Sequence, residues 1–378
     1  MTEFETLLVA LAAVYLALGV VWVRRDAFVF RSHTGRAFDA APANALLGGD
    51  GGALQWLNPL PPFGLAYVVQ PFPVSMGEEG VLAWTSAAQP PGDRPRQPNP
   101  RFLAWADVRR VEARDRDVFV DDELFVRTGS ARLATHVARV LFDLARAKPT
   151  DRARRIDAEL ARAFDTVAIG HALGKAERES APLLPPAIAL FLLVFVATPF
   201  VDLARDIHHD WPWLVLALLG LQAWSVITLW LVATRLDPRE RWKHLLQCAL
   251  SPLAAIRARD AFLRDAVATH SPLAVAKLLL PPAAFESLLT ASLRDAAHPI
   301  PARCPNPDPR AHAVESSWRT NLRTAAARLA PSTAAAALTS PVRLAPDCLA
   351  YCPRCARQYT VPTSLCAGCG DHSLSLFE

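Results

Sequence analysis

Long uncharged stretches alternate with charged ones along this chain, and three of them are long enough to cross a membrane. They cover residues 6–23, 182–201 and 213–234. About 20 apolar residues in a helix span the roughly 30 Å hydrocarbon core of a bilayer. The pattern therefore predicts a membrane α+β protein with three transmembrane helices, whose last two form a hairpin over 182–234. A buried hairpin of a soluble helical domain is the alternative for this pair.

The charges around the first stretch, within residues 1–23, indicate a retained anchor. Glu3 and Glu5 precede it and Arg24 follows it, whereas a cleaved signal peptide, the alternative, begins with basic residues and ends at small ones. Arginine and lysine collect on the cytoplasmic side of membrane spans. Together with Arg235 after the third stretch, the arginines predict an outside amino terminus and a cytoplasmic carboxy terminus in a bacterial inner membrane.

Residues 24–148 are predicted to form a cytoplasmic α+β domain. Runs such as "NPLPPFG" and "AQPPGDRPRQPNP" are typical of turns, and they flank two predicted strands at 63–72 and 80–87. The pattern then predicts a strand through Trp105, Val108 and Val111, a turn at 115–117, and strands around 118–120 and 124–126. A helix follows, with Ser130 as its N-cap and an apolar stripe of Leu133, Val137, Val140, Leu141 and Leu144.

Strands closed by one amphipathic helix, carried by Trp105–Arg146, make residues 101–147 similar to a bacterial pleckstrin-homology-like domain. The resemblance implies a bent sheet plugged at one end by the helix, and a binding or scaffolding role beside a membrane. No diagnostic motif of that family is present, so an unrelated small α+β domain is the alternative.

Helical segments are predicted on both sides of the hairpin. Residues 149–181 are an amphipathic linker, with a helix from Asp151 to about Gly174 capped by Thr150. Residues 235–297 form a helical region interrupted by prolines, either a compact domain or a layer on the inner membrane face. Residues 298–345 combine a proline-rich linker with a helix near 311–330.

The last segment, 346–378, contains two Cys-x-x-Cys pairs. Two such turns place four thiolates around one ion, and the predicted ligands are Cys352, Cys355, Cys366 and Cys369. The segment is similar to a zinc ribbon with rubredoxin-like knuckles, although Ala356 stands where glycine is more common. A closed shell of four sulfurs has no open position, so the predicted Zn²⁺ is structural. Iron and a disulfide are the alternatives, and a reducing cytoplasm disfavours the disulfide.

The remaining cysteines and charges add little chemistry. Cys248 reads as a core residue, Cys304 as a linker residue and Cys348 as a spare thiol. A net charge of +4 is too small to indicate a nucleic-acid partner. No Walker loop, dinucleotide fingerprint, zincin helix or nucleophile elbow occurs. The runs at 48–52, 121–123 and 208–210 read as turns or loops and not as sites.

The sequence thus resembles a bacterial membrane protein with two cytoplasmic binding modules. The predicted function is that of a scaffold or adaptor, whose partners are membrane lipid and a cytoplasmic protein. Two alternatives stay open: a membrane enzyme with an unrecognised site among the 238–297 helices and the hairpin, and a membrane-tethered transcription regulator.

Overall fold

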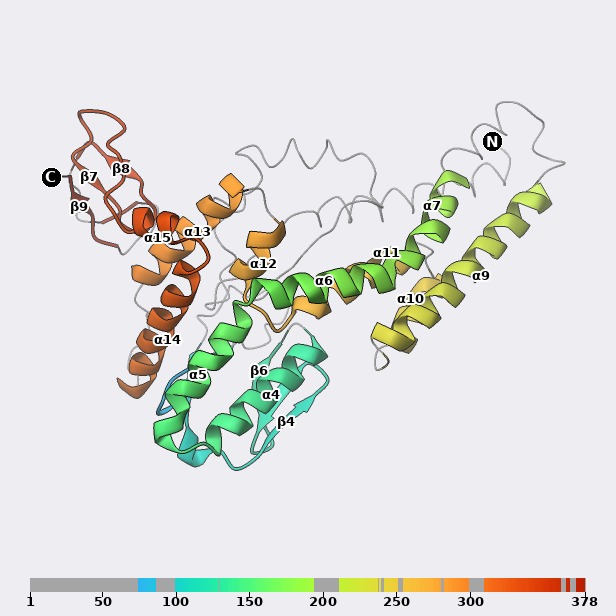
Figure 1. Ribbon diagram of the computed structural model, residues 1–378, viewed down its shortest axis with the longest axis horizontal. Helices are drawn as coiled ribbons and strands as arrows, with labels where there is room; N and C mark the ends of the chain where they lie inside the picture. Colours follow the sequence, from blue (N-terminus) through green and yellow to red (C-terminus); the bar gives the residue numbers. More distant parts are fainter. Residues whose placement is uncertain are drawn as a thin grey trace. The chain divides into compact units, whose positions relative to one another are not determined.

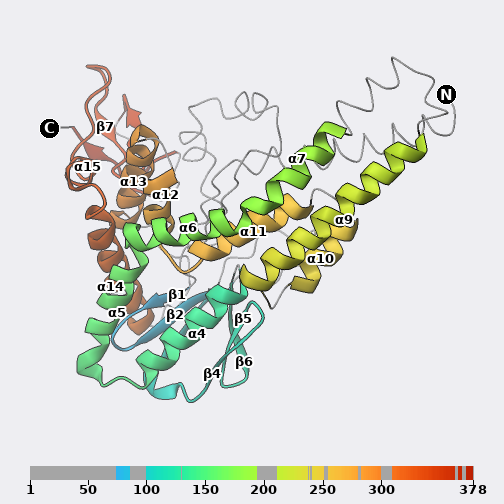
Figure 2. The same cartoon turned by 45° about the vertical axis from the view of Figure 1, so that its right-hand side comes forward.

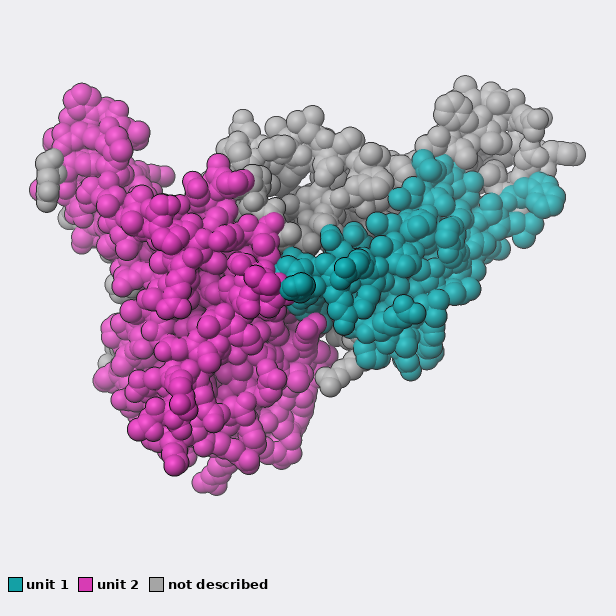
Figure 3. Space-filling view, in the orientation of Figure 1, with its two compact units in different colours: residues 1–28, 50–68, 170–267 teal, residues 29–49, 69–169, 268–378 magenta. Residues whose placement is uncertain are grey.

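A computed structural model describes eleven parts of the chain. They are residues 74–85, 99–128, 130–193, 211–236, 238, 241–250, 254–279, 282–298, 309–361, 365–367 and 372–377. The chain folds into two compact units, which Figure 3 shows in different colours. The first unit includes residues 170–267, and the second includes 69–169 and 268–378.

Six strands of the second unit form two small antiparallel sheets. The first sheet has the order β1 (Val74–Met76), β2 (Gly80–Thr85), β3 (Asn99–Ala104). The second has the order β4 (Val111–Arg114), β5 (Asp117–Val120), β6 (Glu123–Arg127). The mixture of helices and small sheets confirms the α+β part of the predicted fold class.

Helix α4 (Ala131–Ala145) closes these sheets, packing against β4 and β5 (Figure 2). Its start is as predicted, because the Ser130 hydroxyl accepts a hydrogen bond from the Leu133 amide at 3.1 Å. All five residues of its predicted apolar stripe are buried. They share one core with Trp105 and Phe125 from the strands and Trp318 from the helical region.

The predicted strand through Trp105, Val108 and Val111 is wrong. The chain instead makes a short 3₁₀ turn at Trp105–Asp107, between β3 and β4. The turn lets the Trp105 indole enter the core, where its Nε1 donates to the Gly77 carbonyl at 2.8 Å. A buried indole NH needs such a partner, and this one lies 28 residues away in the sequence.

The single helix predicted from Asp151 to Gly174 is also wrong. Two helices occur, α5 (Pro149–Ala163) and α6 (Thr166–Ser180). The Asp165 carboxylate accepts hydrogen bonds from the Val167 and Ala168 amides, at 2.9 and 3.0 Å. Asp165 is therefore the N-cap of a new helix, directly after Phe164, the C-cap of the first one. Thr150 is not a cap either, because α5 begins at Pro149.

Four more helices in the second unit follow the predicted helical regions. They are α12 (Pro272–Leu279), α13 (Pro282–Ala297), α14 (Pro309–Ala327) and α15 (Pro331–Ala337), seen in Figure 1. Each begins at a proline, which lacks the amide hydrogen that a first helical turn leaves unbonded. Side chains tie them together: Lys277 Nζ donates to the Leu329 carbonyl at 2.6 Å, and Arg294 Nε to the Ala337 carbonyl at 2.8 Å.

The first unit consists of helices in its described residues. Besides α6 they are α7 (Leu184–Leu192), α9 (Trp211–Leu236), α10 (Arg241–Leu250) and α11 (Ala254–Val267), with a 3₁₀ turn at Ala181–Leu183. Helix α9 packs against α7 and α10 (Figures 1 and 2). Their shared core includes Leu229, Leu245 and Cys248, which confirms the core position of that cysteine.

One helix among the described residues is long and apolar enough to cross a membrane. This is Val215–Leu236 within α9, and only 22% of its most apolar stretch is buried. The structure does not support the other two predicted spans. Residues 6–23 lie outside the described part of the chain. Of residues 182–201, the structure describes only 182–193, which contain the short helix α7 (Leu184–Leu192).

Candidate metal centre

Three short strands hold the cysteine pairs. Strand β7 (Ala350–Tyr351) pairs on one side with β8 (Gln358–Tyr359) and on the other with β9 (Ser375–Leu376). The first pair, Cys352 and Cys355, occupies the turn between β7 and β8. The second pair begins at Cys366, between Tyr359 and the return into β9. Strands β8 and β9 therefore flank the two cysteine turns.

The first cysteine turn is closed by backbone hydrogen bonds. The Cys352 amide donates to the Arg357 carbonyl at 2.9 Å, and the Ala356 amide to the Cys352 carbonyl at 2.8 Å. Ala356 has φ of 59°, in the left-handed region that favours glycine. The sequence departs from the usual glycine here, yet the backbone keeps the conformation that glycine would serve.

A similar bond closes the second turn. The Cys366 amide donates to the His372 carbonyl at 2.8 Å, and residues 365 and 373 form a bridge beside it. Cys369, the fourth predicted ligand, lies outside the described residues.

The sulfurs of Cys352, Cys355 and Cys366 converge. Their Sγ atoms all lie within 4.8 Å of one another, and those of Cys355 and Cys366 are 3.6 Å apart. Zinc–sulfur bonds of about 2.3 Å in a tetrahedron put neighbouring sulfurs about 3.8 Å apart. The three described cysteines are therefore placed to hold one metal ion. Cys348, four residues earlier, does not belong to this group, as predicted.

Burial protects two of the three sulfurs. Cys352 and Cys366 are fully buried, and Cys355 is exposed. Burial is the main cause that raises the pKa of the Cys352 thiol. A buried thiolate therefore requires a nearby cation, as at a metal site.

Tyr359 completes the surroundings of the sulfurs, a role that no local sequence pattern indicated. Its hydroxyl lies 3.0 Å from Cys366 Sγ and accepts a hydrogen bond from the Ala367 amide at 3.1 Å. With that amide as its donor, the hydroxyl is free to donate to the sulfur. Hydrogen bonds of this kind orient and stabilise metal-bound sulfur.

A second polar cluster, also missed from sequence, lies under helix α4. His136 Nε2 is 2.8 Å from both the Glu159 carboxylate and the Arg162 guanidinium, which also bonds the Thr269 carbonyl at 2.8 Å. Burial raises the pKa of Glu159, but hydrogen bonds from His136 and Arg162 outweigh it and lower the pKa to about 2. The cluster has ordinary ion-pair partners throughout and reads as structural.

The other polar runs flagged in the sequence are not brought together into a site. Asp121 and Asp122 form an exposed hairpin turn with positive φ, as predicted. The Asp121 carboxylate accepts from the Arg110 amide at 2.8 Å, and Asp122 pairs with Arg114 at 2.9 Å. Residues 48–52, 208–210 and Cys304 lie outside the described part of the chain.

Comparison with known proteins gives no family assignment: no protein-family model, no curated protein and no solved structure matches this chain.

Proposed function

We propose that this protein is a membrane-anchored scaffold whose carboxy-terminal ribbon docks a protein partner in the cytoplasm. The observation that carries the proposal is the exposure of two aliphatic side chains beside the cysteine cluster. Val342 is 88% exposed and Leu344 is 84% exposed, the two highest values among the large hydrophobic side chains of the described residues. Large exposed apolar patches mark interaction surfaces, and Val342 and Leu344 are proposed to belong to one.

The segment that carries this pair is held in place. The Gln358 side chain accepts from the Leu344 amide at 2.8 Å and donates to the Val342 carbonyl at 2.7 Å. The Arg343 guanidinium lies over the Phe377 ring at 5.0 Å from its centre. Because the segment is already ordered, a partner does not have to supply the free energy of ordering it.

The neighbourhood of the pair indicates the chemistry of the partner. Five more aliphatic side chains between residues 338 and 376 are exposed: Leu338, Leu349, Val361, Leu365 and Leu376. Arg343 and Arg357 are exposed among them. The matching surface is an aliphatic groove bordered by carboxylates.

The metal proposed for the cluster is zinc, held by Cys352, Cys355 and Cys366 together with Cys369. Three converging sulfurs within two Cys-x-x-Cys pairs support a shell of four thiolates, which suits zinc and leaves no coordination position for a substrate. When bound, the ion supplies a structural cross-link between the two turns. The chain's own strands, each two residues long, supply few contacts to do so.

Membrane anchoring is proposed from helix α9 and its carboxy-terminal end. There the Trp230 and Trp242 rings meet edge to face at 5.1 Å, and the Arg241 guanidinium lies 4.9 Å from Trp230. Tryptophan and arginine together are typical of a cytoplasmic membrane interface. This contact supports α9 as a membrane span with its carboxy-terminal end at the cytoplasmic interface; the other two spans and the outside amino terminus are proposed from the sequence alone.

The sheets closed by α4 are proposed as the second binding module, with the pleckstrin-homology-like architecture. Two small antiparallel sheets and one amphipathic helix after the last strand support this reading. Because the chain is proposed to be anchored in a membrane, lipid headgroups are the proposed ligand of this module.

Chemical cross-linking in native membranes, followed by mass spectrometry, tests the scaffold. We expect one cytoplasmic protein to be recovered with the wild type and lost with the double variant Val342→Glu/Leu344→Glu. The matched control is Val167→Glu, which charges a 67% exposed valine of helix α6 and should leave recovery unchanged. Equal recovery from the double variant and the wild type would refute docking at this surface, and recovery of no protein from the wild type would refute the scaffold itself.

A further inference from the structure

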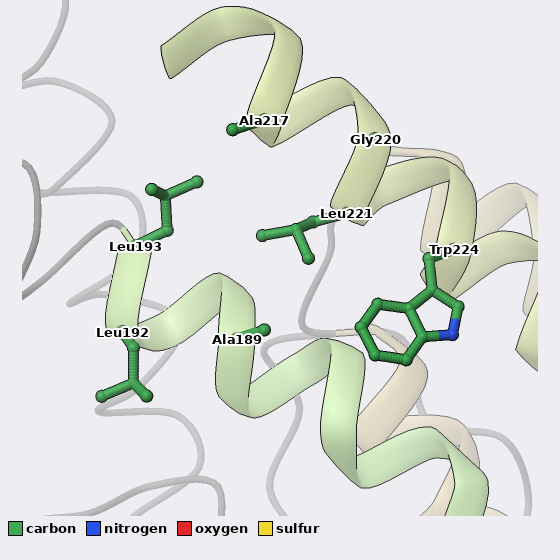
Figure 4. A pocket seen from close by; sticks show the side chains of 7 residues that line it. All are labelled: Ala189, Leu192, Leu193, Ala217, Gly220, Leu221 and Trp224. Atoms are coloured by element: carbon green, nitrogen blue, oxygen red, sulfur yellow. The ribbon is translucent and has the colours of Figure 1, made fainter. Parts of the chain in front are cut away.

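The exposed surface of helix α9 is more apolar than its buried side. Every exposed residue that the structure describes between 213 and 231 is apolar, and the larger ones are Trp213, Leu216, Leu219, Trp224, Ile227 and Leu231. Figure 4 shows Leu221 and Trp224 reaching into an open groove beside α7, which no charged side chain lines. The three polar residues of the same stretch are turned inward: Ser225 and Thr228 are buried, and Gln222 is half-buried. A helix in water shows the opposite arrangement, whereas lipid solvates an apolar exterior.

Helix α10 runs back along the inward face of α9. Near its start, the Trp242 ring meets Trp230 edge to face. Near its end, the Cys248 carbonyl accepts a hydrogen bond from the Gln222 side-chain amide at 2.5 Å. Leu245 and Cys248 share the buried core of α9. The α9 partners of these two contacts are eight residues apart, about 12 Å along a helix, so α10 returns over that distance.

We infer that α10 is a half-helix inserted into the cytoplasmic leaflet of the membrane, with Trp242 and Leu246 facing lipid acyl chains. Both side chains are 65% exposed and lie one helical turn apart. The charged residues of α10, Arg241 and Lys243, are confined to its first turn, and 245–250 carry no charged side chain. Ten helical residues are about 15 Å long, which matches half of a hydrocarbon core of about 30 Å. The inference rests on the proposed membrane span of α9 and is independent of partner docking.

The hydrogen bond from Gln222 is what a helix end inside hydrocarbon requires. The last carbonyls of a helix have no partner within that helix. Water satisfies them at a protein surface, but in hydrocarbon a group of the protein has to do so. Gln222 is the one glutamine between residues 213 and 234, and it bonds a carbonyl in the last turn of α10. At the other end of α10, Arg241 lies 4.9 Å from the Trp230 ring, a pairing typical of the headgroup region.

Photo-cross-linking of the full chain in phospholipid vesicles tests the position of α10. In Leu246→p-benzoylphenylalanine, ultraviolet light attaches the benzophenone to neighbouring C–H bonds, and mass spectrometry identifies the product. The same change at Trp242 gives a second position on α10. The same change at Ile227, a 61% exposed residue of α9, reports membrane insertion of the span itself. Val167, a 67% exposed residue of α6 outside this unit, is the matched control for a side chain in water.

We expect phospholipid adducts from position 246 at no less than about five times the yield from position 167, and within about twofold of the yield from position 227, because acyl chains surround both helices. Adducts at 227 without adducts at 246 and 242 would place α10 in water and overturn the inference. So would a cross-link from 246 to protein, since protein would then cover this face. Absence of lipid adducts at 227 as well would refute the membrane span of α9 and the inference with it.

Discussion

The domain closed by helix α4 and the cysteine ribbon belong to one unit but are stabilised in different ways. Around α4, one apolar core gathers nineteen buried residues from strands and helices. In the ribbon, strands of two residues surround three converging sulfurs, and four of the five described leucine and valine side chains are exposed. Burial of apolar surface can hold the first region together. The second has too little to bury and depends on a metal ion.

The strongest test of this contrast removes a sulfur. Cys352→Ser should release the metal and unfold the ribbon, because a structural zinc site contributes on the order of 10 kcal/mol to folding. Hydrogen exchange of the full chain should show lost protection in 346–377 and unchanged protection in 131–145. Cys348→Ser, which alters a buried cysteine outside the cluster, is the matched control and should keep the metal. A ribbon that stays protected in Cys352→Ser would break the contrast.

The converse test creates a cavity in the apolar core around α4. Leu141→Ala removes a 1% exposed side chain from α4 and should destabilise the domain by about 2 to 5 kcal/mol, measured by urea unfolding followed through tryptophan fluorescence. Leu124→Ala, on a 43% exposed leucine of β6, should cost less than about 1 kcal/mol. Bound metal should be retained in both variants. Loss of metal in Leu141→Ala would mean that the ribbon relies on the same core.

Acid should weaken the α4 domain through its buried polar cluster. The pKa of Glu159 is about 2 in the folded protein against an ordinary value of 4.5. Because the folded value is the lower one, the stabilisation is complete above pH 4.5 and is lost as the pH falls toward 2. The contribution of Glu159 to the free energy of unfolding is at most about 3 kcal/mol.

Protonation of His270 also lowers the stability of the α4 domain as the pH falls, but over a higher pH range than Glu159. Burial, followed by the charge of Arg162, lowers its pKa from 6.5 to about 4. Its neutral form is favoured by folding, so stability is complete above pH 6.5 and declines between 6.5 and 4. Unfolding of the α4 domain measured at pH 2 to 7 should follow both slopes. Glu159→Gln should reduce the lower slope, to which the Asp117 carboxylate also contributes because its bond to Arg127 lowers its pKa, and should leave the upper slope. An unchanged slope below pH 4.5 would contradict the assignment.

The smallest expected effect concerns the cap of α4. Ser130→Ala removes the acceptor for the Leu133 amide and should cost about 1 kcal/mol in the same urea experiment. Thr135→Ala on the exposed side of that helix should not destabilise it, since alanine has the higher helix propensity. Equal losses from the two changes would remove the capping role.

Local patterns predicted the elements whose causes are local. The stripe from Leu133 to Leu144 follows the helical period, and Ser130 precedes it at the capping position, so α4 was predictable from the residues alone. The cysteine pairs were predictable for the same reason, because two short turns fix their geometry. Asp165, directly before Thr166, is a residue type that favours the N-cap position. The apolar stripe that continues past it nevertheless predicted one uninterrupted helix.

Features that depend on distant partners were not predictable in this way. Trp105 leaves the strand pattern because its indole finds the Gly77 carbonyl, and Tyr359 reaches Cys366 only once the ribbon has folded. The exposure of Val342 and Leu344 depends on the Gln358 side chain, which holds a segment that the sequence presents as a plain linker. Tertiary contacts of this kind override local propensity.

The metal content of the purified full-length protein tests the central claim most directly, because the docking surface is built on the cysteine cluster. Elemental analysis by mass spectrometry should find one zinc per chain in the wild type and in Cys348→Ser, and less than a tenth of that in Cys366→Ser and Cys369→Ser. A wild-type chain without zinc, or Cys369→Ser with its zinc intact, would contradict a ribbon held together by four sulfurs.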